Sequence, residues 1–152
     1  MNRAERIRSA ALDGTLGRFV EIEADISNGL PNTTLVGLPD ASVAQARDRC
    51  RAAVVNSGHS WPSNRLTINL APSSLPKTGS HYDLGIALSV LAASGMINPD
   101  ALVGVLAVGE LALDGRLRPV AGVLPATDAG QQANCKTVIV PWANAAEAQL
   151  VV

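Results

Sequence analysis

The sequence predicts a single α+β domain, of mixed α/β character, with helices packed on a mixed sheet. Three observations support this fold class. The 152 residues are enough for one hydrophobic core and few for two domains. Hydrophobic residues make up 47% of the chain and charged residues 16%, a composition typical of a globular domain. Strand patterns come first along the chain, and helical and strand patterns then alternate.

The first part of the chain predicts three strands. Arg8–Leu12 and Arg18–Ile26 are separated by the turn signal Asp13-Gly14. The second of these strands alternates acidic and apolar side chains, which is the pattern of a half-buried strand. A turn at Asn28-Gly29 then leads to a β-branched third strand at Thr33–Leu38.

The middle of the chain predicts two helices on either side of a strand. Asp40 can cap a helix that Gly58 ends. Apolar residues recur in this helix at helical spacing, at Val43, Ala46, Cys50, Ala53 and Val54. Arg65–Leu70 alternates as a strand, and Tyr82–Ser94 is apolar nearly all round, which predicts a buried helix.

The last third predicts a strand, a hairpin, and a helix–strand–helix end. Leu102–Val108 feeds the hairpin, whose turn is Asp114-Gly115, because both central residues of such a turn need a positive φ. Ala121–Ala133 can then form a helix and Thr137–Val140 a short buried strand. Ala143–Val151 begins a last helix without a cap or breaker, so we expect the chain to continue, although a frayed end would look the same.

Composition and simple motifs exclude several classes of protein. The net charge of −1 creates no global field toward nucleic acid or a membrane, so any such contact would be a local patch. The longest apolar run is well short of the roughly 20 residues that span a bilayer, and no apolar segment follows the charged start. Cys50 and Cys135 are isolated, which predicts neither a zinc site nor a disulfide framework. We expect a cytoplasmic location, no metal and no membrane partner.

Val108–Pro125 has the pattern of a strand, a tight turn, a second strand and the start of a helix, and Gly79–Leu91 leads into a buried helix. These two segments resemble the catalytic segments of the Lon-type protease domain. Val108–Pro125 has the frame of that family's second segment, with Leu124 where the family has its lysine, and Gly79–Leu91 resembles the first segment, with Asp83 at the position of the serine. Aspartate has no hydroxyl to form an alkoxide and leucine has no amine, so these positions cannot form a serine–lysine dyad. We therefore expect no catalytic residue at either position.

Several candidate residues also have structural interpretations. Ser80-x-x-Asp83 before an apolar run is a capping-box pattern, which predicts that Asp83→Ala costs about 0.5–2 kcal/mol. Lys77 completes two motifs of penicillin-recognising enzymes, but it lies in a proline-bounded loop, where we expect a solvated side chain. His59 and His81 are expected to be exposed or capping residues. Glu110 could act as a base, although no partner is visible.

Arginines form the densest basic cluster of the chain. Arg47, Arg49 and Arg51 lie close together, and Arg47 and Arg51 share one helical face because they are four residues apart. Arg116 and Arg118 line one face of the second strand of the hairpin. These five arginines form either a solvated surface or a contact with phosphates or with a neighbouring subunit. No G-x-x-x-x-G-K-[ST] loop is present, so we expect this domain to bind no ATP.

Six short segments spread along the chain carry a further resemblance: Ser27–Pro31, Val36–Asp40, Arg47–Arg49, Asn69–Pro72, Tyr82–Leu84 and Gly109–Arg116. With these segments, the chain from about Ala10 to Val152 resembles the N-terminal domain of the ComM family, also called YifB or magnesium-chelatase-like proteins. The resemblance implies that residues 1–152 have the fold of the Lon protease domain, which domain 2 of a small-subunit ribosomal protein and GHMP kinases share.

The resemblance also implies a functional setting. An AAA+ module holding ATP and magnesium should follow, and the full-length protein should be a hexameric ATPase and DNA helicase for branch migration in natural transformation. This domain would then be a non-catalytic accessory that holds no cofactor and supports ring assembly or guides DNA. An atypical hydrolase using Asp83, Glu110 or Ser89 is the alternative, and a chelatase-like chaperone subunit acting on a protein partner is a third possibility.

Overall fold

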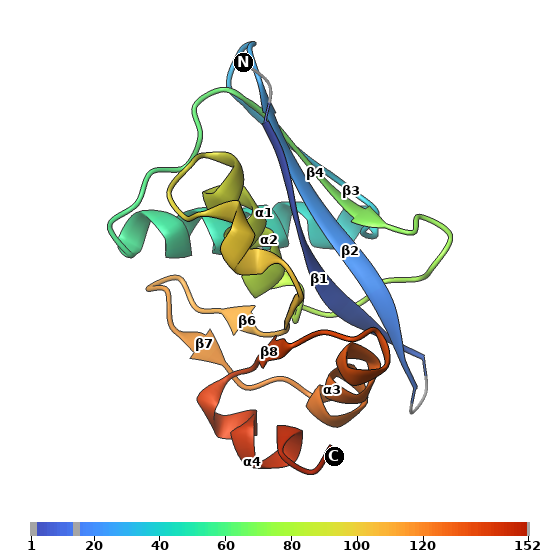
Figure 1. Ribbon diagram of the computed structural model, residues 1–152. Helices are drawn as coiled ribbons and strands as arrows, with labels where there is room; N and C mark the ends of the chain where they lie inside the picture. The colour runs from blue at the N-terminus through green and yellow to red at the C-terminus, as the bar shows by residue number, and fades with distance from the viewer. Residues whose placement is uncertain (1–2, 14–15, 152) are drawn as a thin grey trace.

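A six-stranded sheet in the order β3-β4-β2-β1-β5-β8 organises the computed structural model, which describes residues 3–13 and 16–151 (Figure 1). The strands are β1 (Arg3–Asp13), β2 (Leu16–Ser27), β3 (Asn32–Val36), β4 (Arg65–Ala71), β5 (Val105–Ala107), β6 (Glu110–Leu111), β7 (Leu117–Arg118) and β8 (Thr137–Ile139). The helices are α1 (Asp40–Asn56), α2 (Asp83–Ala93), α3 (Val123–Gln132) and α4 (Ala145–Ala148), with 3₁₀ turns η1 (Pro99–Leu102) and η2 (Trp142–Asn144). The predicted mixed α+β class is confirmed.

The first two predicted strands are both present, are longer than predicted and form a long antiparallel pair. Arg3 pairs with Ile26 at one end of the register and Asp13 with Leu16 at the other. The central residue of the predicted turn, Gly14, lies outside the described residues. Within β2 the apolar positions of the alternating pattern are buried, at Val20, Ile22, Ala24 and Ile26. The sheet therefore presents one continuous apolar face along β2.

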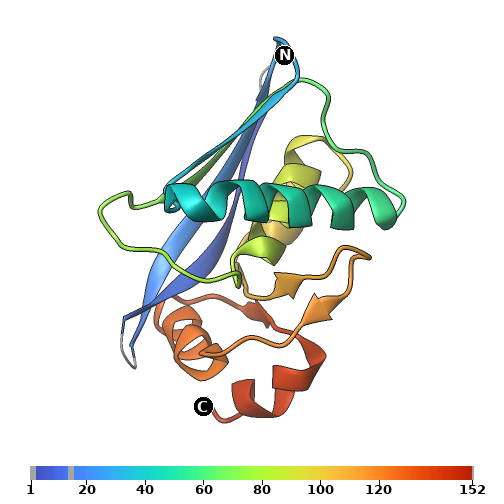
Figure 2. The same cartoon turned by 180° about the vertical axis from the view of Figure 1, so that it is seen from behind.

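Helices cover both faces of the sheet. Because successive residues of a strand point to opposite faces, one strand contributes to the core on each side. Val105 and Ala107 of β5 belong to the core under α1 and α2, whereas Leu106 between them belongs to the core under α3. In both views the β6–β7 hairpin lies between the α1–α2 pair and the region of α3 and α4 (Figures 1 and 2). The hairpin can therefore reach the start of α2.

Two predicted elements have the wrong bounds. The predicted strand Leu102–Val108 shortens to β5, because residues 99–102 form a 3₁₀ turn. The predicted last helix, Ala143–Val151, divides into η2 and the short α4. The Asn144 side chain lies at this break, where its amide accepts from the Val120 N–H and donates to the Val120 carbonyl, both at 3.0 Å. A long-range contact thus fixes a segment whose local pattern favoured one helix.

Lys77 is buried rather than solvated, and the prediction for this residue is wrong. Only 2% of it is exposed. Its Nζ donates to the carbonyl oxygens of Pro72 at 2.6 Å and Leu75 at 2.8 Å. Burial lowers the pKa of this ammonium. The lysine closes its own loop because it satisfies backbone acceptors that the loop cannot pair with backbone donors.

His81 is also buried, which corrects the expectation of an exposed or capping residue. Its Nε2 donates to the carbonyl oxygen of Ala10 at 2.7 Å, and its ring lies 4.1 Å from that of Tyr82. Burial lowers the pKa of the imidazole, and the hydrogen bond to Ala10 opposes this effect. His81 therefore holds the loop before α2 against β1 in its neutral form.

We expect His81 to make the fold less stable as the pH falls. Because the pKa of His81 is lower in the folded state, the unfolded chain takes up a proton first, near pH 6.5. The contribution of His81 to the free energy of unfolding should be complete above about pH 6.5 and decline below it, by at most about 1.4 kcal/mol per pH unit. In urea denaturation between pH 5 and 7.5, the free energy of unfolding of His81→Gln should depend less on pH than that of the original protein. His59→Gln, at an exposed site, should match the original protein.

Candidate functional site

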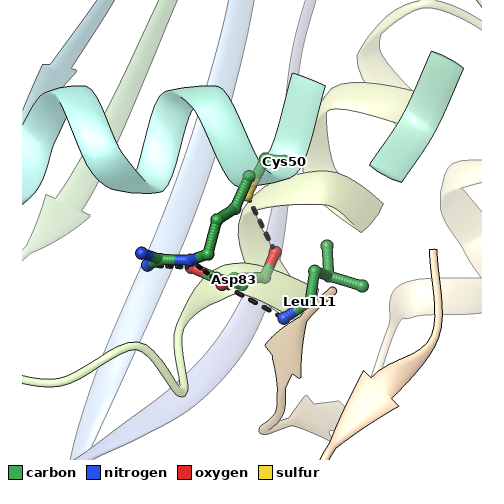
Figure 3. Close-up of polar contacts among 4 residues, drawn as sticks. Cys50, Asp83 and Leu111 are labelled. Atoms are coloured by element: carbon green, nitrogen blue, oxygen red, sulfur yellow. Dashed lines mark hydrogen bonds and ion pairs between the residues drawn. The ribbon is translucent and has the colours of Figure 1, made fainter. Parts of the chain in front are cut away.

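The candidate site is centred on Asp83, the first residue of α2, where α1, α2 and β6 meet (Figure 3). Arg49 of α1 donates two hydrogen bonds to the Asp83 carboxylate, from Nε to Oδ2 at 2.7 Å and from Nη2 to Oδ1 at 3.0 Å. The Leu111 backbone N–H donates to Oδ2 at 3.1 Å. The Cys50 thiol donates to the Asp83 carbonyl oxygen at 3.4 Å. One carboxylate thus connects three elements that are distant in sequence.

The capping-box prediction for Asp83 is wrong. The residue before the helix is Tyr82, and α2 has no side-chain cap hydrogen bond. Asp83 contacts the Ser80 backbone only through its own N–H, which donates to the Ser80 carbonyl at 3.1 Å. Two parallel hydrogen bonds from a charged guanidinium stabilise the carboxylate more than one bond from a backbone N–H, so the carboxylate turns toward Arg49.

The surroundings make this an ion pair with a buried acid. Asp83 is 1% exposed and Arg49 23% exposed. Burial raises the pKa of Asp83, while the hydrogen bonds from Arg49 and Leu111 oppose that rise. The hydrogen bond to Asp83 raises the pKa of Arg49. Burial also raises the pKa of the Cys50 thiol, so this cysteine is a neutral donor here and not a nucleophilic thiolate.

A cavity of about 230 Å³ opens beside the ion pair. Its walls include Ser42 and Arg49 of α1, Ser80, and Glu110 of β6. Glu110, the predicted candidate base, thus shares a cavity with Asp83. Ser89, the third residue of the predicted hydrolase alternative, is buried on α2, and its hydroxyl donates to the Ile86 carbonyl at 2.8 Å. The structure brings Asp83 and Glu110 together and directs Ser89 into its own helix.

Leu124 lies in the first turn of α3 and is 38% exposed. The start of α3 lies beside the loop before α2, since Val120, Val123 and His81 line one small apolar hollow. The two segments that resemble the Lon catalytic segments are therefore neighbours. The second of them presents an aliphatic side chain where a lysine would supply an amine.

The five predicted arginines fall into three environments. Arg49 is held by Asp83. Arg47 and Arg51 line a second cavity, of about 380 Å³, on another side of α1. Arg116 lies in the hairpin turn, where its Nε donates to Asp114 at 2.8 Å, and Arg118 of β7 is exposed opposite Glu110. Of the five, Arg47 and Arg51 line one shared cavity, and no local sequence pattern indicated its other walls.

Within residues 3–13 and 16–151, no three His, Cys, Asp or Glu side chains come together as metal ligands would. None of the helices in the described part of the chain is long and apolar enough to span a membrane.

Comparison with known proteins gives consistent matches. The family model for subunit ChlI of Mg-chelatase matches residues 22–144. An uncharacterized protein of Mycobacterium tuberculosis is 52% identical over 96% of this chain and 29% of its own length. YifB of Salmonella typhimurium is 48% identical over 87% of this chain and 26% of its own. Competence protein ComM of Haemophilus influenzae is 45% identical over 95% of this chain and 28% of its own.

The chain spans less than a third of the length of these relatives. Lon proteases are among the weaker matches, at 30% identity for one from Roseiflexus castenholzii. Their similarity agrees with the mixed α+β fold.

Proposed function

We propose that this chain, which belongs to the family of subunit ChlI of Mg-chelatase together with YifB and ComM, is a non-catalytic accessory domain of a larger DNA-remodelling ATPase. One observation carries the non-catalytic part of the proposal. The residue at the position of the Lon nucleophile, Asp83, is bound by Arg49 and by the Leu111 N–H.

This arrangement opposes hydrolysis for chemical reasons. A serine–lysine dyad needs a hydroxyl beside a neutral amine that can take its proton. Asp83 offers a carboxylate whose two oxygens both accept hydrogen bonds, and its partner Arg49 stays protonated and cannot act as a base. Leu124 supplies no titratable group. The ion pair instead joins α1, α2 and the hairpin, which is a structural task.

The wider setting rests on the relatives. They are more than three times as long as this chain, and one is named a competence protein. We infer that ATP and magnesium bind elsewhere in the longer protein, and that its partners are further copies of itself in a hexameric ring and DNA undergoing branch migration. The domain would support the ring or guide the DNA.

The purified chain should cleave neither casein nor peptide substrates, and serine-directed phosphonates should not label it. The reason is the absence of a paired hydroxyl and amine at positions 83 and 124. Mass spectrometry after phosphonate treatment gives the readout, with a Lon protease as the positive control. Labelling that disappears when one serine, such as Ser80, is changed to alanine would contradict the proposal.

A further inference from the structure

We propose that the groove beside α1 binds single-stranded nucleic acid, with Arg47 and Arg51 on phosphates and Trp61 against a base. The inference deepens the proposed function by naming the partner that this domain contacts, and it rests on that function. It concerns a surface separate from the Asp83 site. The two are therefore testable independently.

The groove is built by three segments. Arg47, Asp48 and Arg51 of α1 form one wall, residues 61–63 form the other, and residues 31–33 at the start of β3 close it. Its volume of about 380 Å³ lies in the range of small-ligand sites. It can therefore take one nucleotide of a chain but not a folded domain.

Two guanidinium groups supply the charge. Arg47 and Arg51 are one helical turn apart and face the same side of α1. Arg47 makes only a 3.4 Å contact with its exposed neighbour Asp48, and such surface pairs hold little energy. Arg51 has no hydrogen-bond or ion-pair partner among the residues that the structure describes. The guanidinium fork fits phosphate oxygens, so both groups can serve a phosphodiester chain.

Trp61 supplies an aromatic wall in a fixed orientation. Its Nε1 donates to Thr33 Oγ1 at 3.1 Å, which ties the indole to β3. Arginines beside an anchored aromatic ring are the features by which proteins bind single strands, since the base stacks on the ring while the cations follow the backbone. A duplex keeps its bases stacked inside and would offer the groove phosphates alone. An acidic peptide would pair with the arginines and leave the indole uncovered.

The test is a fluorescence anisotropy titration of a labelled oligothymidine with the 152-residue chain over a salt series. Arg47→Ala/Arg51→Ala should weaken binding about tenfold at ~0.1 M salt and make the salt slope shallower by about 1.4, because each lost phosphate contact on a single strand removes about 0.7. Arg116→Ala/Arg118→Ala is the matched control. It removes the same charge from the hairpin and should bind as the original protein does.

Tryptophan fluorescence gives a second readout. In a Trp142→Phe background, which leaves Trp61 as the one tryptophan, the oligothymidine should quench the emission. Trp61→Leu should weaken binding with an unchanged salt slope. If Trp61→Leu fails to fold, the arginine pair and the quenching decide the question.

Three results would overturn the inference. They are no saturable binding at low salt, equal loss in the two arginine pairs, and equal binding of a duplex or of polyglutamate at matched charge. Each would leave the phosphonate result at the Asp83 site unchanged, so failure here is distinguishable from failure of the non-catalytic assignment.

Discussion

Asp83→Ala should lower the free energy of unfolding by about 3–5 kcal/mol, because removing one partner of a buried ion pair leaves the other uncompensated. Arg49, which is 23% exposed, would lose its bidentate acceptor, and the buried Leu111 N–H would lose the carboxylate oxygen that accepts from it at 3.1 Å. Urea denaturation at pH 7 measures the change. A helix cap at this position would cost less, about 0.5–2 kcal/mol.

Two further variants separate the ion pair from simple packing. Asp83→Asn keeps an oxygen for Leu111 and should cost less than alanine. The double variant Arg49→Met/Asp83→Leu replaces both charges with apolar groups and should recover most of the lost stability. A cost below about 1 kcal/mol for Asp83→Ala, or additive effects in the double-mutant cycle with Arg49→Ala, would contradict a structural ion pair.

The periodic elements of this fold could be predicted from the sequence because their signals are local. The alternation along β2 predicted its buried face, and four of the five apolar positions expected along α1 are buried. The hairpin forms where Asp114-Gly115 predicted it, but the predicted turn conformation is wrong. Gly115 has a φ of +95° and Asp114 has no positive φ, because the connection is a three-residue loop closed by the Gly115 N–H, which donates to the Ala112 carbonyl at 2.9 Å. A pattern that spans a few residues is enough when the element packs one face on a single core.

The ion pair could not be predicted, because its partners are 34 residues apart and the local pattern around Asp83 resembled a cap. The prediction of a solvated Lys77 was wrong for a related reason. A charged loop residue is normally solvated, and the two carbonyl groups that accept from Lys77 come together only when the loop has folded. In both cases a long-range or loop-level hydrogen bond decided where a charged group lies.

The basic cluster could be predicted only in part. Arg47 and Arg51 share a face because the helical period places them there, and the structure agrees. The period says nothing about Trp61, which comes from the loop after α1, or about Thr33, which holds it. The groove exists only after β3, α1 and this loop have packed together.

Gly37→Ala should be the other strongly destabilising substitution, at about 3 kcal/mol. Gly37 connects β3 to α1 with a φ of +100°, and an added Cβ would overlap the carbonyl oxygen of Leu70 on β4. The backbone conformation costs about 1 kcal/mol for alanine, and the overlap adds about 1–3 kcal/mol, because a backbone carbonyl in a sheet cannot move aside. The urea midpoint measures the loss.

Gly58→Ala is the control that separates the two costs. Gly58 follows α1 with a similar φ of +88°, but a Cβ there would meet no atom within 4 Å. It should therefore cost about 1 kcal/mol, the conformational part alone. Equal losses of stability at the two glycines would show that the Leu70 carbonyl can move aside.

If the Leu70 carbonyl stays in place, the chain must shift in the connection between β3 and α1, and Arg47 and Arg51 then move relative to Trp61. Gly37→Ala should accordingly weaken oligothymidine binding under conditions where it is still folded, whereas Gly58→Ala should not.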